Sequence, residues 1–271
     1  TLFVLLIVLV GYAMNSGAFD QGVKFLFAAD FSKISANSVL IAMGHAFFTL
    51  SLGMGAIMVY GSYLPKDTSI AKTAFIVAGA DTLVALLAGL AIFPIVFSNQ
   101  LEPGAGPGLI FQTLPIAFGH MPGGTFFGTL FFILLVFAAW TSSISLIEPA
   151  VAWLVENKNM SRQRACFWTG LATWFMGLGT VFSFNIWSDV KFLDKTFFDL
   201  IDYLKSNIML PLGGLAIAIF AAWTMNTVTI RSELAMVNER SFKLWRFLVR
   251  YVTPVAVIIV FLNVVGLLDF T

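Results

Sequence analysis

Four long stretches without a charged side chain constrain this chain most. They lie between Lys33 and Lys66 (32 residues), Glu102 and Glu148 (45), Arg164 and Asp189 (24), and Lys205 and Arg231 (25). A helix that crosses a bilayer needs about 20 mostly apolar residues, because hydrocarbon offers no partner to backbone polar groups. These runs therefore predict an all-α integral membrane protein. Charged residues make up only 11% of the chain, against about 25% in soluble domains, which excludes a coiled coil or a disordered chain.

Hydropathy and the polar connections predict one transmembrane domain, residues 1–271, with seven spans. We expect the spans at residues 1–14, 36–63, 69–98, 124–156, 164–185, 198–228 and 245–268. Residues 99–123 carry Gly and Pro at both ends, which predicts an ordered, lid-like loop rather than a span, and we expect this loop on the extracellular side. The chain starts inside an apolar run without an initiator Met, so we interpret it as a fragment.

Lysines and arginines are unevenly distributed between alternate loops, ten on one side and five on the other. Cytoplasmic loops carry the excess of positive charge. The first span therefore runs outward, and we expect the C-terminal end to lie outside. No basic run suggests a nucleic-acid partner, and membrane lipid is the expected surrounding. A single cysteine, Cys166, excludes an internal disulfide.

The second span is interrupted in its middle by the segment TLSLGMG, residues 49–55. Glycine costs a helix interior about 1 kcal/mol relative to Ala, and Ser competes for backbone hydrogen bonds. An opened helix at this depth is tolerable where it lines a cavity or binds an ion, while close helix packing through small residues is the structural alternative.

Asp81 lies in a span with no charged residue for the next 20 positions. A carboxylate near the bilayer centre costs at least about 2.5–3.5 kcal/mol, so it is expected to hold a cation or a proton. A protonated Asp that bonds to a neighbouring helix is the structural alternative.

The fourth span places Ala138, Thr141 and Ser142 on one helix face, at i, i+3 and i+4. Hydroxyls with a nearby carbonyl form an oxygen-rich site that suits Na⁺. The structural alternative is that such hydroxyls bond back to the carbonyl four residues earlier.

Three motifs in this order, FFTLSLGMG (47–55), ADTLVALLAGLAIF (80–93) and FAAWTSSISLIEP (137–149), resemble the neurotransmitter:sodium symporter family. The closest resemblance is to its bacterial amino-acid transporters, which have the LeuT-type inverted-repeat fold. The match runs from the family's fifth helix to its eleventh, so the resemblance implies that the N-terminal helices are missing. It also implies the inner membrane of a bacterium.

The resemblance implies two sodium sites. Thr49 and Asp81 match ligands of the first sodium, and Ala138, Thr141 and Ser142 match those of the second. Ala85 stands where chloride-dependent relatives have a serine, so no chloride is expected and Asp81 is expected to supply the fixed negative charge.

The residues that match positions around the substrate are Phe48, Thr49, Ser51, Gly53, Met54, Ser142 and Leu146. Met54 replaces a Phe of the leucine-selective type, which suggests a roomier pocket for bulky or aromatic hydrophobic amino acids. Asp202 matches an outer-gate aspartate, and Glu156 takes the place of the inner-gate aspartate near Tyr63. The partner arginines of both gates are expected in the missing N-terminal part.

We therefore expect sodium-coupled amino-acid symport by alternating access. A channel or receptor-like relative of the same fold, without concentrative transport, is the alternative. An enzyme is not expected, because an aspartyl protease needs two facing carboxylates and only Asp81 lies deep. The residues His45 and Ser51, six positions apart, lie on poorly matched faces for a serine protease. The sequence gives no indication of the oligomeric state.

Overall fold

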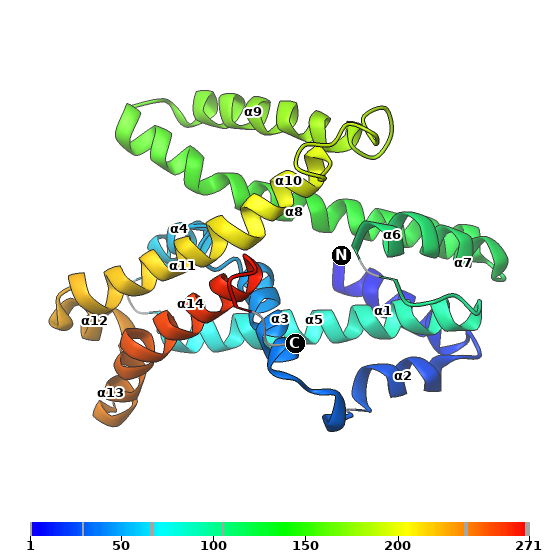
Figure 1. Ribbon diagram of the computed structural model, residues 1–271, viewed down its shortest axis with the longest axis horizontal. Coiled ribbons are helices and arrows are strands. Elements are labelled where there is room, and N and C mark those ends of the chain that lie inside the picture. The colour runs from blue at the N-terminus through cyan, green and yellow to red at the C-terminus, as the bar shows by residue number, and fades with distance from the viewer. Residues whose placement is uncertain (1, 29, 66–67, 105, 236–237, 269–271) are drawn as a thin grey trace. The chain divides into compact units, whose positions relative to one another are not determined.

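The computed structural model describes residues 2–28, 30–65, 68–104, 106–235 and 238–268, and the regular elements named within them are all helices (Figure 1). The predicted start of the first span and the predicted extracellular end of the chain fall outside these ranges. The elements in chain order are α1 Leu2–Met14, α2 Phe19–Phe27, η1 Phe31–Lys33, α3 Ala36–Thr49, α4 Ala56–Ser62, α5 Ile70–Ser98, α6 Gly106–Gly108, η2 Leu109–Thr113, α7 Leu114–His120, α8 Gly124–Lys158, α9 Arg162–Phe182, α10 Phe197–Tyr203, η3 Leu204–Met209, α11 Leu210–Ile219, η4 Phe220–Thr224, α12 Thr227–Leu234, α13 Glu239–Phe247, η5 Leu248–Val252 and α14 Thr253–Val264.

Five helices among the described residues are long and apolar enough to cross a membrane. They are Ile70–Ser98, Gly124–Lys158, Arg162–Phe182, Phe197–Thr224 and Glu239–Asn263. A sixth candidate is the pair α1 and α2, which meets the same test but is bent by 115°. The helix α3 is apolar but has only 14 residues. The assignment of seven spans in one domain stays a prediction.

Prolines explain three short π-helical turns that interrupt these helices. The turns η2, η3 and η5 are each followed, after one residue, by Pro115, Pro211 and Pro254. Proline has no N–H to donate and its ring clashes with the preceding turn, so the backbone before it must adjust. A π turn makes that adjustment without ending the helix.

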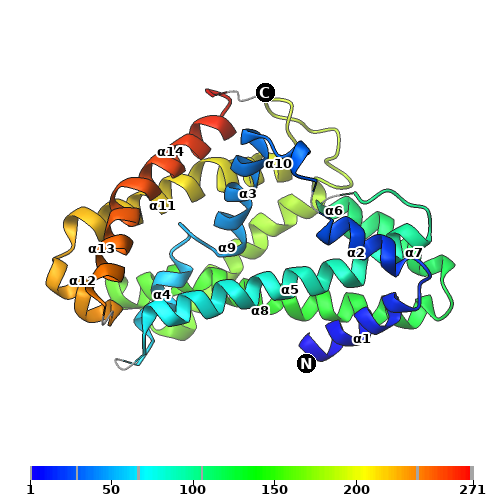
Figure 2. The same cartoon turned by 90° about the horizontal axis from the view of Figure 1, so that it is seen from below.

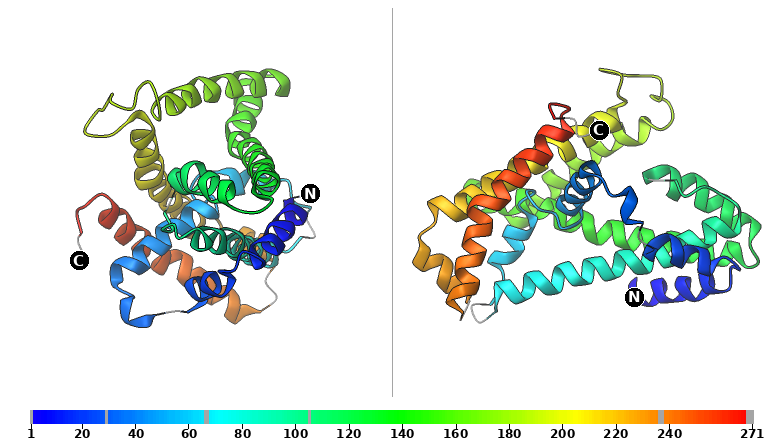
Figure 3. Two further views of the ribbon diagram at one scale, coloured as in Figure 1. Left: turned by 90° about the vertical axis from the view of Figure 1, so that its right-hand side faces the viewer. Right: turned by 60° about the horizontal axis from the view of Figure 1, so that its bottom comes forward.

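The chain divides into two compact units, residues 1–33 with 77–144, and residues 34–76 with 145–271. In the first unit, fully buried residues of α1, α5 and α7 form the core, among them Leu9, Ile95 and Leu114. The helix α7 lies within the predicted lid loop. Its Ala117 and Phe118 are buried, and Phe118 packs against Gly128 of α8. The chain turns back between α7 and α8 (Figure 3). Burial of these apolar side chains stabilises a helix in a segment that Gly and Pro alone mark as a loop.

In the second unit, α11 and α14 pack side by side, and α3 contacts both of them (Figure 2). The helix that begins at Phe197 ends at Thr224, four residues before the predicted end of the sixth span. The reason is local: Asn226 accepts a hydrogen bond from the Val228 N–H and begins the separate helix α12.

Candidate functional site

The candidate site is built around the break between α3 and α4. Helix α3 ends at Thr49 and α4 begins at Ala56, with non-helical backbone between them. The φ angles of Ser51, Gly53 and Gly55 are 53°, 84° and 82°. A left-handed conformation costs a residue with a Cβ about 1–2 kcal/mol and costs glycine almost nothing. The two glycines therefore make the break possible, and the predicted interruption at residues 49–55 is confirmed.

Helix α11 holds this break by direct backbone contact. A Cβ at Gly53 would overlap the Leu210 carbonyl oxygen and lie 2.7 Å from the Gly214 nitrogen. A Cβ at Gly213 would overlap the Gly53 carbonyl, and one at Gly214 would lie 2.6 Å from the Phe47 ring. Glycine on both sides is what allows the two backbones to approach so closely.

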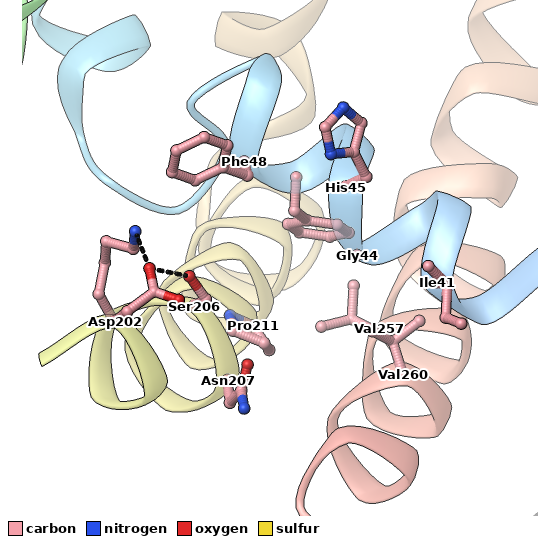
Figure 4. A pocket seen from close by; sticks show the side chains of 12 residues that line it. Ile41, Gly44, His45, Phe48, Asp202, Ser206, Asn207, Pro211, Val257 and Val260 are labelled. Atoms are coloured by element: carbon pink, nitrogen blue, oxygen red, sulfur yellow. Dashed lines mark hydrogen bonds and ion pairs between the residues drawn. The ribbon is translucent and has the colours of Figure 1, made fainter. Parts of the chain in front are cut away.

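A cavity of about 370 Å³ lies beside the α3 half, between α3, η3 and α14 (Figure 4). Its wall is apolar at Ile41, Val257 and Val260, and polar at His45, Asp202, Lys205, Ser206 and Asn207. Phe48, one residue before the end of α3, also lines it and is half exposed. This cavity joins one predicted substrate residue to one predicted gate residue within the second unit.

Asp202, the predicted outer-gate carboxylate, already has a cationic partner on its own helix. The Lys205 ammonium donates to Asp202 Oδ1 at 2.6 Å, and the Ser206 hydroxyl lies 3.4 Å from the same oxygen (Figure 4). The Lys205 Nζ also lies 4.5 Å from the centroid of the Phe48 ring. The expected pairing of Asp202 with an arginine of the first helix stays a prediction.

The α4 half is held by polar bonds. The Tyr63 hydroxyl donates to Glu148 Oε1 at 2.8 Å, and the Tyr60 hydroxyl lies 3.2 Å from the Ser145 hydroxyl. Arg162, the first residue of α9, donates from Nη2 to both Glu148 oxygens at 2.8 Å. The Glu148 carboxylate is buried, and Arg162 and Tyr63 give it a cation and at least one donor for each oxygen.

Glu148, Arg162 and Lys205 are candidate functional residues to which the sequence analysis assigned no role. Glu148 ends the longest charge-free run, which signals a special position, but its partner is not evident from spacing alone. Glu156, the predicted inner-gate residue near Tyr63, is exposed, and Tyr63 donates to Glu148. The inner-gate role of Glu156 stays a prediction.

The predicted sodium ligands lie on three helices. Thr49 ends α3 in the second unit, while Asp81 lies partly buried in α5 in the first, so their meeting at one ion stays a prediction. The predicted ligands of the second sodium all lie on α8, in the first unit: Ala138, Thr141 and Ser142.

The Thr141 hydroxyl bonds back to earlier carbonyl groups of its own helix, as expected if this motif is structural and binds no ion. This hydroxyl lies 3.0 Å from the Phe137 carbonyl oxygen and 3.1 Å from that of Ala138, and donates toward them. Such a bond uses the proton of the hydroxyl, whereas a sodium ion is bound through the oxygen lone pairs. The bond is therefore compatible with both interpretations of this motif.

The predicted substrate residues gather mainly at the break. Phe48 and Thr49 end α3, and Ser51, Gly53 and Met54 lie in the non-helical segment. Leu146 lies on α8 in the same unit and is exposed. Ser142, four residues before it, belongs to the first unit, so its place beside the others stays a prediction.

Comparisons with known proteins agree on one family. The chain is 38% identical to an uncharacterized sodium-dependent transporter, YhdH, of Bacillus subtilis, over 99% of this chain and 60% of that protein. It is 35% identical to an uncharacterized sodium-dependent transporter of Haemophilus influenzae, over 97% of this chain and 58% of that protein. The Drosophila melanogaster sodium-dependent serotonin transporter is 26% identical, over 61% of this chain and 28% of that protein. The chain thus spans about 60% of the length of the first two relatives.

The fold also matches a solved structure, that of MhsT in complex with L-phenylalanine. The TM-score is 0.86 at 40% identity, over 97% of this chain and 60% of that one. This match confirms the LeuT-type fold. The family model for the sodium:neurotransmitter symporters matches residues 1–269. This is a family of membrane transporters rather than enzymes, and the chain belongs to the sodium:neurotransmitter symporter family.

Proposed function

We propose that the full-length protein carrying this chain is a sodium-coupled symporter for amino acids that works by alternating access. The observation that carries the proposal is the helix break at Leu50–Gly55, which glycines of α11 hold by backbone contact. A helix that ends at Thr49 directs its last carbonyl groups toward the break, and such groups attract a cation. Sodium-dependent relatives and a neighbour in complex with L-phenylalanine support the choice of ion and substrate.

The proposed substrates are bulky or aromatic hydrophobic amino acids. Phe48 lies just before the break and Met54 lies within it, and together they offer a flat ring and a flexible apolar side chain. The segment between them carries the hydroxyl of Ser51, while the helix ends supply backbone groups for a zwitterion. This arrangement favours an apolar amino acid over one with a charged side chain.

Two sodium ions are proposed to order the break before the substrate binds. Thr49 and Asp81 would hold the first ion, and Ala138, Thr141 and Ser142 the second. With Asp81 as the fixed negative charge and Ala85 unable to bind an anion, transport is proposed to be independent of chloride. If an ion favours the substrate-ready state, it raises substrate affinity, and the substrate raises ion affinity by the same factor.

A thermal-shift screen of the full-length protein against all amino acids, with and without Na⁺, tests this function. The expected result is stabilisation by bulky hydrophobic amino acids in sodium and little stabilisation without it. A bound ligand at 100 times its Kd stabilises a protein by about 2.7 kcal/mol, which such a screen detects. Stabilisation that is equal in sodium and choline would contradict the coupling.

Uptake into vesicles separates a symporter from a channel or receptor-like protein of the same fold. A symporter accumulates labelled amino acid above its outside concentration when a sodium gradient is imposed. Equilibration without accumulation would show a channel, and binding without uptake would show a receptor-like protein. The same assay with chloride replaced by gluconate tests chloride independence.

A further inference from the structure

Lys205 contacts two residues that come from different elements of the cavity. Its ammonium bonds to Asp202, one turn earlier on the same helix, and lies over the Phe48 ring at the end of α3. All three side chains line the same cavity (Figure 4 labels Phe48 and Asp202). The π turn that contains Lys205 therefore places one cation between a carboxylate and an aromatic face.

These contacts do little for the stability of the fold. The Lys205 and Asp202 side chains are 39% and 49% exposed, and ion pairs this exposed contribute little. Their effect is on side-chain position. A cation is attracted to the face of an aromatic ring, and the same cation attracts the carboxylate, so the ring and the carboxylate are fixed relative to each other.

We propose that Lys205 is a positioning residue of the substrate site, whose ammonium holds Phe48 and Asp202 together at the cavity. This inference rests on the proposed function, in which Phe48 contacts the substrate. Without the ammonium, Phe48 can leave the cavity wall, and the bound substrate must then restrict it. We expect the loss mainly in substrate affinity, because the ring of Phe48 must be ordered when the substrate binds.

Kinetics of the full-length protein in proteoliposomes test this role. Lys205→Met keeps the apolar stem and removes the charge, so KM for the best substrate of the screen should rise about three- to tenfold, the range expected for a cation–π contact. The maximal rate should change by less than about twofold. Lys205→Arg keeps a cation that pairs with carboxylates and stacks on rings, and should restore KM.

Lys195→Met is the matched control. Lys195 also lies over an aromatic ring, 5.1 Å from the centroid of Tyr203, but it is not a lining residue of the cavity. Its KM should equal that of the wild type. A Lys205→Met KM within about twofold of the wild type, or an equal rise in Lys195→Met, would overturn the proposal.

NMR of the Phe48 ring tests the same contact independently of transport. With ring-¹³C-labelled phenylalanine at position 48, which leaves the electron density of the ring unchanged, the ring ¹³C resonances should shift or broaden in Lys205→Met and remain in place in Lys205→Arg and Lys195→Met. An unchanged resonance in Lys205→Met would refute the positioning role. Absence of sodium-dependent substrate binding in the wild type would instead refute the proposed function, while the NMR result still decides the role of Lys205.

Discussion

The two halves of the broken helix are held in different ways. The α3 half packs against α11 and α14 through apolar side chains and through the backbone of glycines. Gly44 of α3, for example, lies beside the Val260 side chain of α14. The α4 half is tied by side-chain hydrogen bonds of Tyr60 and Tyr63 to α8. Both sets of contacts lie within the second unit.

This difference indicates how each half can move. Apolar contact has no preferred direction, so a packed helix can tilt or slide while it keeps its burial. A hydrogen bond to a buried carboxylate is directional, and breaking it leaves a costly unpaired group. We therefore expect α4 to switch between discrete positions, and α3 to adjust more gradually around the fixed contact of Gly53 with α11.

The largest effect is expected for Gly53→Ala, which disrupts the backbone contact between the break and α11. The new Cβ would overlap the Leu210 carbonyl in a backbone conformation that favours glycine. Strain and overpacking together should cost about 2–5 kcal/mol. We expect a strong loss of folded full-length protein, measured by the thermal unfolding midpoint in detergent and by size-exclusion chromatography.

Gly61→Ala is the control for this substitution. Gly61 lies in α4, and nothing is within 4 Å of the position that its Cβ would occupy. Alanine favours the helix there, so the midpoint should stay equal or rise slightly. Equal effects of the two substitutions would show that the backbone contact at Gly53 is not what holds the break.

A smaller effect is expected for Arg162→Met, which removes the cation beside Glu148, the acceptor of the Tyr63 hydrogen bond. The substitution leaves the Glu148 carboxylate buried without its cation, and loss of one partner of a buried pair is costly. Because Arg162 itself is largely exposed, we expect about 2–3 kcal/mol rather than the full cost of a buried pair. Thermal unfolding measures it, and Arg164→Met, an exposed charge two residues on, is the control.

If Arg162→Met and Arg164→Met unfold at the same temperature, the buried carboxylate does not depend on its cation. The ion pair with Arg162 would then play no part in holding the acceptor of the Tyr63 hydrogen bond.

The smallest effects are expected for two tyrosines of the α4 half, Tyr60 within α4 and Tyr63 directly after it. Tyr63→Phe removes a bond to a charged acceptor and should cost about 1–2 kcal/mol, whereas Tyr60→Phe removes a bond between neutral hydroxyls and should cost about 0.5–1 kcal/mol. The ranking of their unfolding midpoints checks this. A larger loss in Tyr60→Phe would show that Ser145, and not Glu148, is the main attachment of α4.

Much of the broken helix was predictable because its causes are local. Gly53 and Gly55 appear in the sequence as helix breakers, and the structure uses both at positive φ. The helical segment of α7 was not predictable in the same way. Gly and Pro mark both ends of residues 99–123, but Ala117 and Phe118 form a helix because they are buried in the first unit.

The partners of the charged residues were the hardest to predict. Asp202 has Lys205 three residues later, a spacing that is visible in the sequence, yet nothing in the sequence indicates that the same ammonium lies over Phe48. Glu148 and Arg162 are separated by a helix end and a turn, so only the path of the chain between α8 and α9 decides that they meet. The meeting of Thr49 and Asp81 at an ion depends on both units and stays a prediction.

Equilibrium binding of a labelled bulky hydrophobic amino acid to the full-length protein, in sodium and in choline, tests the central claim most directly. If the broken helix holds a monovalent cation together with a zwitterion, affinity in sodium should exceed that in choline by at least about tenfold, a coupling of about 1.4 kcal/mol. Equal affinities in the two salts would contradict the account.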